Sequence, residues 1–223
     1  TDAGYGSADI IYGGDIDSWI LFANSFKLKM GITLADADDA KAKSVVESAV
    51  AAGVFSSNAD NALFAYKSGP PNTNPIWVDL VQSGRKDFVA NKTIIDIMSP
   101  LNDPRIPLYF TNDFAGGYSG GNPGASSNYT TFSKPSLQII AADFPGLLLS
   151  YDEVEFDLAE AVERGYNVGG TALQHYNAAV TASILYWGGT TTDATAYLAQ
   201  PSVNYLTATG TYRQKIGMQK WIA

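Results

Sequence analysis

The sequence predicts a mostly α-helical fold in which antiparallel helical hairpins alternate with long irregular loops. Apolar residues recur at helical spacing over several long segments. Glycines follow the ends of those segments, and runs with the alternation of β-strands are sparse. With 46% hydrophobic and 16% charged residues, the chain can form a large core. We therefore expect paired, stacked helices and at most a small β ribbon.

The first predicted hairpin comprises helices over residues 15–34 and 38–52. The first helix carries two apolar stripes on opposite sides, one made of Trp19, Phe22, Ala23, Phe26, Met30 and Thr33 and the other of Leu21, Leu28 and Ile32. We expect a helix of this kind to be covered on both faces. Asp38 is a suitable N-cap for the second helix, and Gly53 ends it.

A second hairpin is predicted over residues 151–164 and 171–187. Gly165 ends its first helix, and Gly188 follows the second. The second helix has an apolar stripe made of Leu173, Tyr176, Val180, Ile184 and Trp187. Two such hairpins resemble tetratricopeptide-like stacking, although no clean repeat of about 34 residues is present.

The remaining predicted elements are shorter. Helical patterns cover residues 76–89, 93–98, 193–200 and 212–222, and prolines at positions 100 and 104 interrupt the chain. The strongest strand signal covers residues 106–111, with 137–141 as its candidate partner. Pairing of these segments would give a small ribbon beside a large loop.

That loop, residues 111–135, is rich in glycine and nearly free of charge but contains aromatic side chains. A loop of this length in a compact domain is usually functional or disordered. Aromatic rings can stack on the apolar face of a sugar, while asparagine and serine bind its hydroxyl groups. The candidate ligand-binding residues are therefore Phe114, Tyr118, Asn122, Tyr129 and Phe132. The alternative is that these rings fasten the loop to the core.

A second polar loop covers residues 66–75 and contains Asn72. Trp77 follows directly after it. Both residues are candidates for the same ligand, although a place in the core is the favoured interpretation for Trp77.

Three acidic residues, Glu153, Asp157 and Glu160, share one face of the predicted helix at 151–164. Glycosidases work with paired acids, so this row is a candidate catalytic site. However, Arg164 lies on the same face four residues after Glu160. We therefore interpret the row as a solvated, partly ion-paired stripe, and we expect no enzyme.

Other chemistry has little support in the sequence. The chain has one histidine, His175, within a predicted helix, so we expect it to be structural rather than part of a metal cluster or a catalytic triad. It has no cysteine and no nucleotide-binding motif, and we expect no cofactor and no metal. The net charge of -8 disfavours nucleic acid as a partner.

Several segments carry patterns that are specific in combination. They are residues 15–30 (DIDSWILFANSFKLKM), 102–110 (NDPRIPLYF), 151–165 (YDEVEFDLAEAVERG), 176–188 (YNAAVTASILYWG) and 219–223 (QKWIA). Together they resemble the SusD/RagB family of outer-membrane nutrient-binding lipoproteins, in particular its SusD-like branch. Departures from the family pattern are Ser150, where many members have Arg, and Phe26 and Lys29, where Leu and Arg are usual.

The resemblance implies a single SusD-like helical domain over residues 1–223, an internal or C-terminal fragment of a longer, lipid-anchored chain. It implies non-catalytic binding of an oligosaccharide at the surface of the outer membrane and delivery to a SusC-like, TonB-dependent transporter. No apolar run approaches the roughly 20 residues that span a bilayer, so membrane attachment would depend on the lipid. The alternatives are a tetratricopeptide-like scaffold that binds a peptide or protein and, with less support, a glycoside hydrolase.

Overall fold

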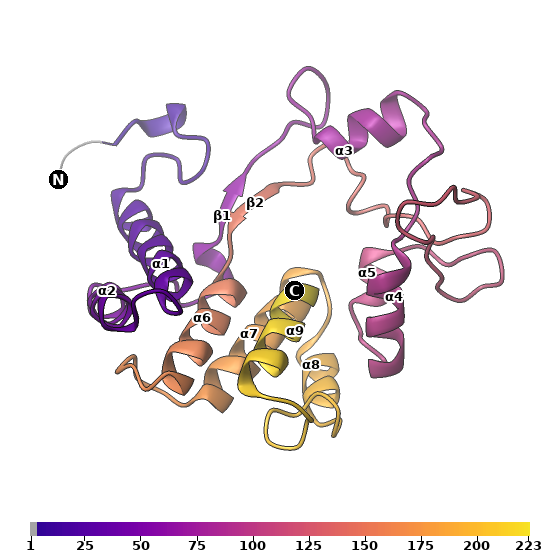
Figure 1. Ribbon diagram of the computed structural model, residues 1–223. Coiled ribbons are helices and arrows are strands. Elements are labelled where there is room, and N and C mark those ends of the chain that lie inside the picture. Colours follow the sequence, from indigo (N-terminus) through magenta and orange to yellow (C-terminus); the bar gives the residue numbers. More distant parts are fainter. Residues whose placement is uncertain (1–3) are drawn as a thin grey trace.

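The computed structural model describes residues 4–223, and its fold is mostly helical, as predicted (Figure 1). Within these residues the helices are α1 (Ile16–Leu34), α2 (Asp39–Ala51), α3 (Pro75–Trp77), α4 (Lys92–Met98), α5 (Ile106–Tyr109), α6 (Tyr151–Glu163), α7 (Ala172–Tyr186), α8 (Thr191–Leu198) and α9 (Tyr212–Ile222). A small antiparallel ribbon pairs β1 (Ala62–Phe64) with β2 (Gly146–Leu149). No helix in this range has the length and hydrophobicity needed to span a membrane.

The first predicted hairpin is formed by α1 and α2, and α1 also packs on α6. Asp15 caps α1 by accepting a hydrogen bond from the backbone of Asp17, and Asp38 caps α2, as predicted. The two helices approach closely at Gly31, where a Cβ would lie 2.7 Å from Cγ2 of Val46. A larger residue at position 31 would therefore push the hairpin apart.

The prediction that α1 is covered on both faces is wrong. Leu28 and Ile32 are buried against α2 and α6. On the other side, Phe26 is 46% exposed and Met30 is 60% exposed. The described residues supply a neighbour for the Leu28 side of the helix, whereas the Met30 side faces solvent.

The second predicted hairpin is formed by α6 and α7, and α9 packs against both. Phe156, Tyr176 and Val180 are buried in its core. Trp187, at the end of the predicted stripe, is only half-buried and lies against Tyr109, with ring centroids 4.5 Å apart. The end of α7 thus meets the part of the chain that carries the long loop.

The predicted strands at 106–111 and 137–141 are wrong. Residues 106–109 form α5, with Pro107 in its first turn, where proline suits a helix. Ile106 and Tyr109 are buried on the same side of this helix, which explains why the apolar run could be mistaken for a strand. Residues 137–140 form a turn. The ribbon that exists leads from the helical hairpins to the loop-bearing part of the chain (Figure 1).

Two predicted helices also differ in their bounds. The helix expected over 76–89 is α3 followed by a π-helical turn at Val78–Gln82, and Gly84, with φ of 70°, lies beyond its end. The helix expected over 193–200 begins earlier, because Thr190 forms a capping box with Asp193.

Arg105 holds α5, from which the long loop at residues 111–135 continues, against the helical hairpins. Its guanidinium is fully buried and donates to both carboxylate oxygens of Asp103, at 2.9 and 2.6 Å. It also donates to Oγ of Ser183 on α7 and to Oε1 of Gln219 on α9, each at 3.0 Å. We call these four residues the Arg105 node. Because it joins α5 to α7 and α9, the node fixes where the long loop begins.

Candidate functional site

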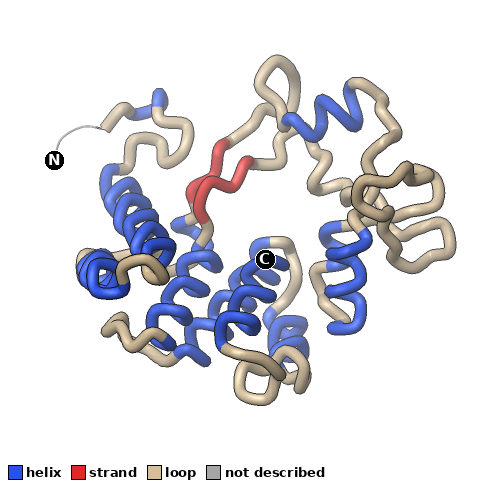
Figure 2. Tube along the Cα trace, in the orientation of Figure 1, coloured by secondary structure: helices blue, strands red, loops and turns tan. Residues whose placement is uncertain are grey.

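The predicted loop at 111–135 is held against the chain before α4. The backbone of Gly121 donates to the carbonyl of Ala90 and accepts from the backbone of Lys92, at 2.8 and 2.9 Å. A Cβ at Gly120 would lie 2.4 Å from the backbone nitrogen of Lys92, so only glycine allows this approach. Figure 2 shows the two irregular segments side by side next to α4.

A hollow of about 450 Å³ opens between these two segments. We call it the polar cleft; it is lined by residues 86–91, 121–123 and 125–127. Asn91, Asn122, Ser126 and Ser127 supply amide and hydroxyl groups to the cleft. This composition suits a ligand with many hydroxyl groups.

The charges at the cleft are few and partly neutralised. Asp87 accepts from Arg85 at 2.5 Å, and the Arg85 guanidinium lies 5.2 Å from the ring centroid of Phe88. Phe88 is 42% exposed. The sequence did not single out this ring, because residues 76–89 were assigned to a helix. An exposed aromatic ring can stack on the apolar face of a sugar.

The aromatic candidates of the long loop have different environments. Phe114 is 86% exposed, and its backbone donates to the carbonyl of Thr131. Tyr118 is half-buried against the cluster that contains Met98 and Tyr109, so it fastens the loop to the core. The ring of Tyr129 lies 5.2 Å from Nζ of Lys134, and Phe132 is half-buried.

Among the candidates, the structure brings only Asn122 into the polar cleft. Asn72 is exposed, and its carbonyl accepts from the backbone of Lys67. Trp77 is half-buried on α3. Neither of them lines the cleft. Their loop is held against residues 139–141 instead, because the side chain of Asn74 donates to the carbonyls of Ile139 and Ala141.

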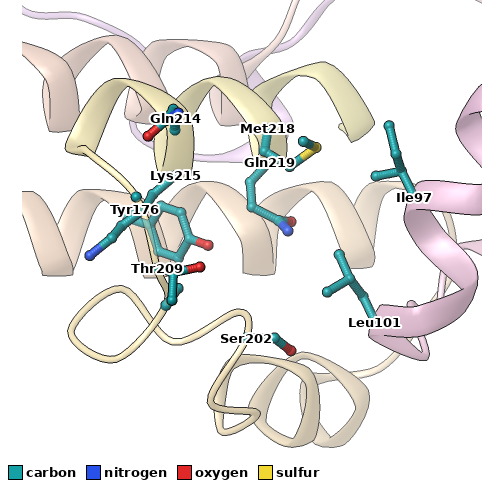
Figure 3. A pocket seen from close by; sticks show the side chains of 11 residues that line it. Ile97, Leu101, Tyr176, Ser202, Thr209, Gln214, Lys215, Met218 and Gln219 are labelled. Carbon is teal, nitrogen blue, oxygen red and sulfur yellow. The ribbon is translucent and has the colours of Figure 1, made fainter.

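A second hollow, of about 470 Å³, lies between α4 and α9 (Figure 3). Ile97 and Leu101 face Met218 across it. Two of the polar side chains at its wall are already bonded: Gln219 belongs to the Arg105 node, and the hydroxyl of Tyr176 donates to the carbonyl of Val203. This hollow therefore offers mainly apolar surface.

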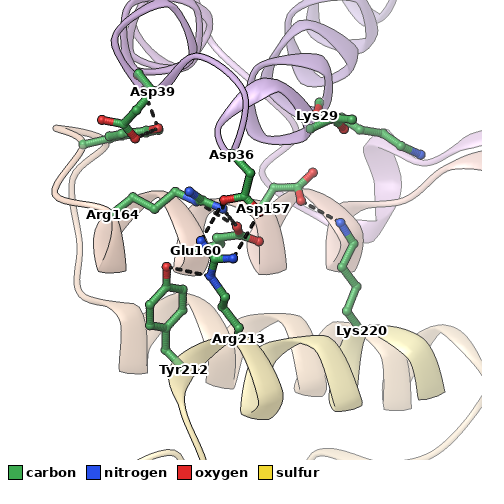
Figure 4. A network of polar contacts seen from close by, with 11 residues as sticks. Lys29, Asp36, Asp39, Asp157, Glu160, Arg164, Tyr212, Arg213 and Lys220 are labelled. Carbon is green, nitrogen blue, oxygen red and sulfur yellow. Dashed lines mark hydrogen bonds and ion pairs between the residues drawn. The ribbon is translucent and has the colours of Figure 1, made fainter.

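The acidic row on α6 is ion-paired, as predicted, and the prediction that it is solvated is wrong for Asp157, whereas Glu153 and Glu160 are partly exposed (Figure 4). Asp157 is 2% exposed and lies 2.6 Å from Lys220 on α9. Burial raises the pKa of Asp157 to about 6, against the opposing effect of the Lys220 ammonium. Glu153 lies 2.9 Å from Lys29 on α1. Asp157 is covered where α9 packs against α6.

The other half of the row is also engaged. Glu160 lies 2.7 Å from Arg164, which reaches Asp36 at 2.8 Å, and Arg213 on α9 binds the same Asp36 carboxylate at 2.7 Å. Each of the three carboxylates of the acidic row therefore has a cationic partner. These ion pairs hold α6 against α9 and against the connection between α1 and α2. Their role is therefore structural.

His175 is held between two oxygen acceptors. Its Nδ1 lies 2.7 Å from Oε2 of Glu155, and its Nε2 lies 3.1 Å from the carbonyl of Gly169. Burial opposes a charge on the ring, but the hydrogen bonds to Glu155 and Gly169 outweigh it and raise the pKa of His175. No group of three or more His, Asp or Glu side chains within residues 4–223 is suited to hold a metal.

The stacked hairpins and the small ribbon define a mostly helical, tetratricopeptide-like fold. Comparison with known proteins identifies the family of the chain. The profile of the SusD-like family described as "Starch-binding associating with outer membrane" matches residues 1–223. The chain belongs to the SusD-like family, which is associated with the outer membrane. No curated protein matches it significantly.

Solved structures agree with this assignment. A chitin-binding SusD homologue from Flavobacterium johnsoniae is 28% identical, with a TM-score of 0.84, and the match covers 99% of this chain and 51% of that one. A SusD homologue from Bacteroides uniformis is 28% identical, with a TM-score of 0.83, covering 99% of this chain and 52% of that one. The chain thus spans about half the length of these relatives.

Proposed function

We propose that this chain binds a neutral oligosaccharide at the polar cleft and does not cleave it. The observation that carries the proposal is the composition of the cleft, in which amide and hydroxyl groups lie beside the exposed ring of Phe88. Asn122 on the long loop and Asn91 before α4 would bind sugar hydroxyls from two sides. Phe114 is exposed on the same loop but does not line the cleft, so it is not part of this site.

Chitin fragments are the first ligand to test, because two solved relatives are described as chitin-binding. Calorimetric titration with chito-oligosaccharides should give binding that weakens several-fold in Phe88→Ala and in Asn122→Ala. Each stacking ring should contribute on the order of 1 kcal/mol, since a sugar face buries modest apolar area and part of the gain is offset by ordering the loop. Starch-derived oligosaccharides serve as a second ligand class.

Tyr5→Ala is the matched control, because Tyr5 is 89% exposed and does not line the polar cleft. Its affinity should equal that of the parent protein. Normal binding by both Phe88→Ala and Asn122→Ala would place the ligand elsewhere. Tyr118 is left unchanged, since its half-buried ring supports the loop.

The engagement of the acids supports binding without cleavage. Glu153 and Glu160 each have a cationic partner within 3 Å, and Asp157 is covered. Incubation with polysaccharide should release no reducing ends. Turnover that Glu153→Gln or Glu160→Gln abolishes would contradict the proposal and favour a glycoside hydrolase.

We further propose that the bound oligosaccharide is passed to a SusC-like, TonB-dependent transporter at the cell surface, with a lipid anchor in the full-length protein. The family's association with the outer membrane supports this setting. Co-purification of the full-length protein with such a transporter from detergent-solubilised outer membranes is the test. Purification of the protein without any transporter, under conditions that preserve other outer-membrane complexes, would contradict it.

A further inference from the structure

The Phe88 ring of the polar cleft lies on a stretch of chain whose own backbone does not fix it. Within residues 4–223, no hydrogen bond joins the backbone of residues 86–89 to another part of the backbone. The nearest backbone hydrogen bonds are those of Ser83 and Ala90, on either side of the stretch. The orientation of the exposed Phe88 ring therefore depends on the side chains beside it.

Arg85 is one of these side chains. Its guanidinium carbon lies over the Phe88 ring, 5.2 Å from the ring centroid. A cation in this place is attracted by the negative face of the aromatic ring. Because the guanidinium covers one face of Phe88, a sugar would stack on the opposite face.

The Arg85 guanidinium is itself anchored by two carboxylates. Its Nε and Nη2 both donate to Oδ2 of Asp87, at 3.0 and 2.5 Å, and its Nη1 lies 3.9 Å from Oδ1 of Asp79. Asp79 belongs to the π-helical turn Val78–Gln82, which precedes the irregular segment. Arg85 therefore connects the Phe88 ring to the last helical turn before the cleft.

We propose that Arg85 is a positioning residue of the polar cleft, which fixes the Phe88 ring in the orientation that stacks on the oligosaccharide. This inference rests on the proposed function of the cleft. Arg85 does not line the cleft, so it acts through Phe88 and not on the sugar. A ring that is fixed before the ligand arrives loses less conformational freedom on binding, which raises the affinity. The attraction of a cation to an exposed ring corresponds to about two- to fivefold in an equilibrium constant.

A double-mutant cycle of Arg85→Met and Phe88→Ala tests the proposal by calorimetric titration. The probe is the hexasaccharide that the parent protein binds, chitohexaose or maltohexaose. Arg85→Met alone should weaken binding by about two- to fivefold. In the Phe88→Ala background the same substitution should have no further effect, because the ring through which Arg85 acts is gone. Arg85→Lys should bind with intermediate affinity, since it keeps a cation but has no second donor for Asp87.

Lys134→Met is the matched control. Nζ of Lys134 lies 5.2 Å from the centroid of the Tyr129 ring, the same separation as between Arg85 and Phe88, and neither Lys134 nor Tyr129 lines the cleft. The control should bind the hexasaccharide as the parent protein does. Thermal melts of each variant, compared with the parent protein, show that a change in affinity does not result from unfolding.

The Phe88 ring can also be followed without any ligand. In NMR spectra of protein labelled with ¹³C in its phenylalanine rings, the Phe88 signal is the one that Phe88→Ala removes. The order parameter of this ring should fall in Arg85→Met and stay unchanged in Lys134→Met, because only the first substitution removes the anchored cation beside Phe88. An unchanged order parameter in Arg85→Met would overturn the proposal whatever the ligand is.

The titrations separate failure of this inference from failure of the proposed function. Parent-like affinity of Arg85→Met, alongside weaker binding by Phe88→Ala, would overturn the inference alone. Equal losses on replacing Arg85 in both backgrounds would also overturn it, because Arg85 would then contact the sugar itself. Normal binding by both Phe88→Ala and Asn122→Ala would remove the proposed function of the cleft and the inference with it.

Discussion

Replacing Arg105 with methionine tests whether the Arg105 node holds the loop-bearing segment in place. The substitution keeps an apolar stem but removes every donor. The Asp103 carboxylate, which is 3% exposed, then stays buried without its cationic partner. Oγ of Ser183 and Oε1 of Gln219 each lose the hydrogen bond that Arg105 donates to them. Breaking a buried ion pair by removing one partner costs about 3–5 kcal/mol. Because the total stability of a domain is roughly 5–15 kcal/mol, the loss should be large.

Urea unfolding followed by circular dichroism measures this loss. The midpoint should fall with little change in the slope, since the buried area is nearly the same. The double variant Asp103→Leu, Arg105→Met should recover much of the loss, because it removes the unpaired charge as well. Arg85→Met is the matched control: Arg85 also pairs with an aspartate two residues away, but at the surface, and its midpoint should not move measurably. A loss below about 1 kcal/mol for Arg105→Met would refute the reasoning.

Further predictions concern the core, the pH response and the loop. Phe156→Ala should lower the free energy of unfolding by about 3–5 kcal/mol in urea titrations, since Phe156 is fully buried. The pKa of His175 is raised in the folded state, so its stabilising effect is complete below its ordinary pKa of 6.5 and is lost as the pH rises through the folded value. The His175→Gln variant should therefore melt at a lower temperature than the parent protein, and this difference in melting temperature should be largest at acidic pH. A difference that stays constant across pH would contradict the prediction. Gly120→Ala should weaken oligosaccharide binding by pushing the loop off Lys92, whereas Gly117→Ala, which meets no backbone nearby, should bind normally in the same titration.

The long helices could be predicted from the sequence because their signals are local. Asp38 and the glycines at positions 53 and 165 lie where a cap and two stops are needed, and the structure has them in those roles. Tyr176 and Val180, which lie four residues apart in the predicted stripe, are both buried. The family resemblance, which rests on segments near both ends of the chain, is confirmed by the match over residues 1–223.

The two faces of α1 show where periodicity stops being informative. Both stripes are apolar, so the sequence predicts burial for both, but burial depends on what lies next to the helix. Leu28 meets α2 and α6, whereas Met30 meets solvent. The same apolar pattern therefore marks a core position on one side of α1 and an exposed surface on the other.

The polar cleft could be predicted only in part, because it is formed by pairing of segments about 30 residues apart in the chain, whose contact leaves no local pattern. The glycine-rich loop was found from composition, and Asn122 was found with it. Phe88 was missed, since Gly84 ends the preceding helix early and turns residues 85–90 into an irregular segment. Loop aromatics predicted as a single set have separate environments, with Tyr118 against the core and Phe114 in solvent.

The acidic row on α6 separates the binding and catalytic interpretations most clearly. Its spacing alone fits a pair of catalytic acids as well as it fits a set of ion pairs. The deciding information comes from α9, far along the chain, which brings Lys220 to Asp157 and Arg213 to Asp36. A general acid needs access to substrate, and Asp157 has 2% of its surface exposed and no lining role in the polar cleft. Its raised pKa, about 6, therefore results from burial between helices. The perturbed carboxyl of Asp157 therefore reports how closely α9 packs over α6 and does not indicate a catalytic acid.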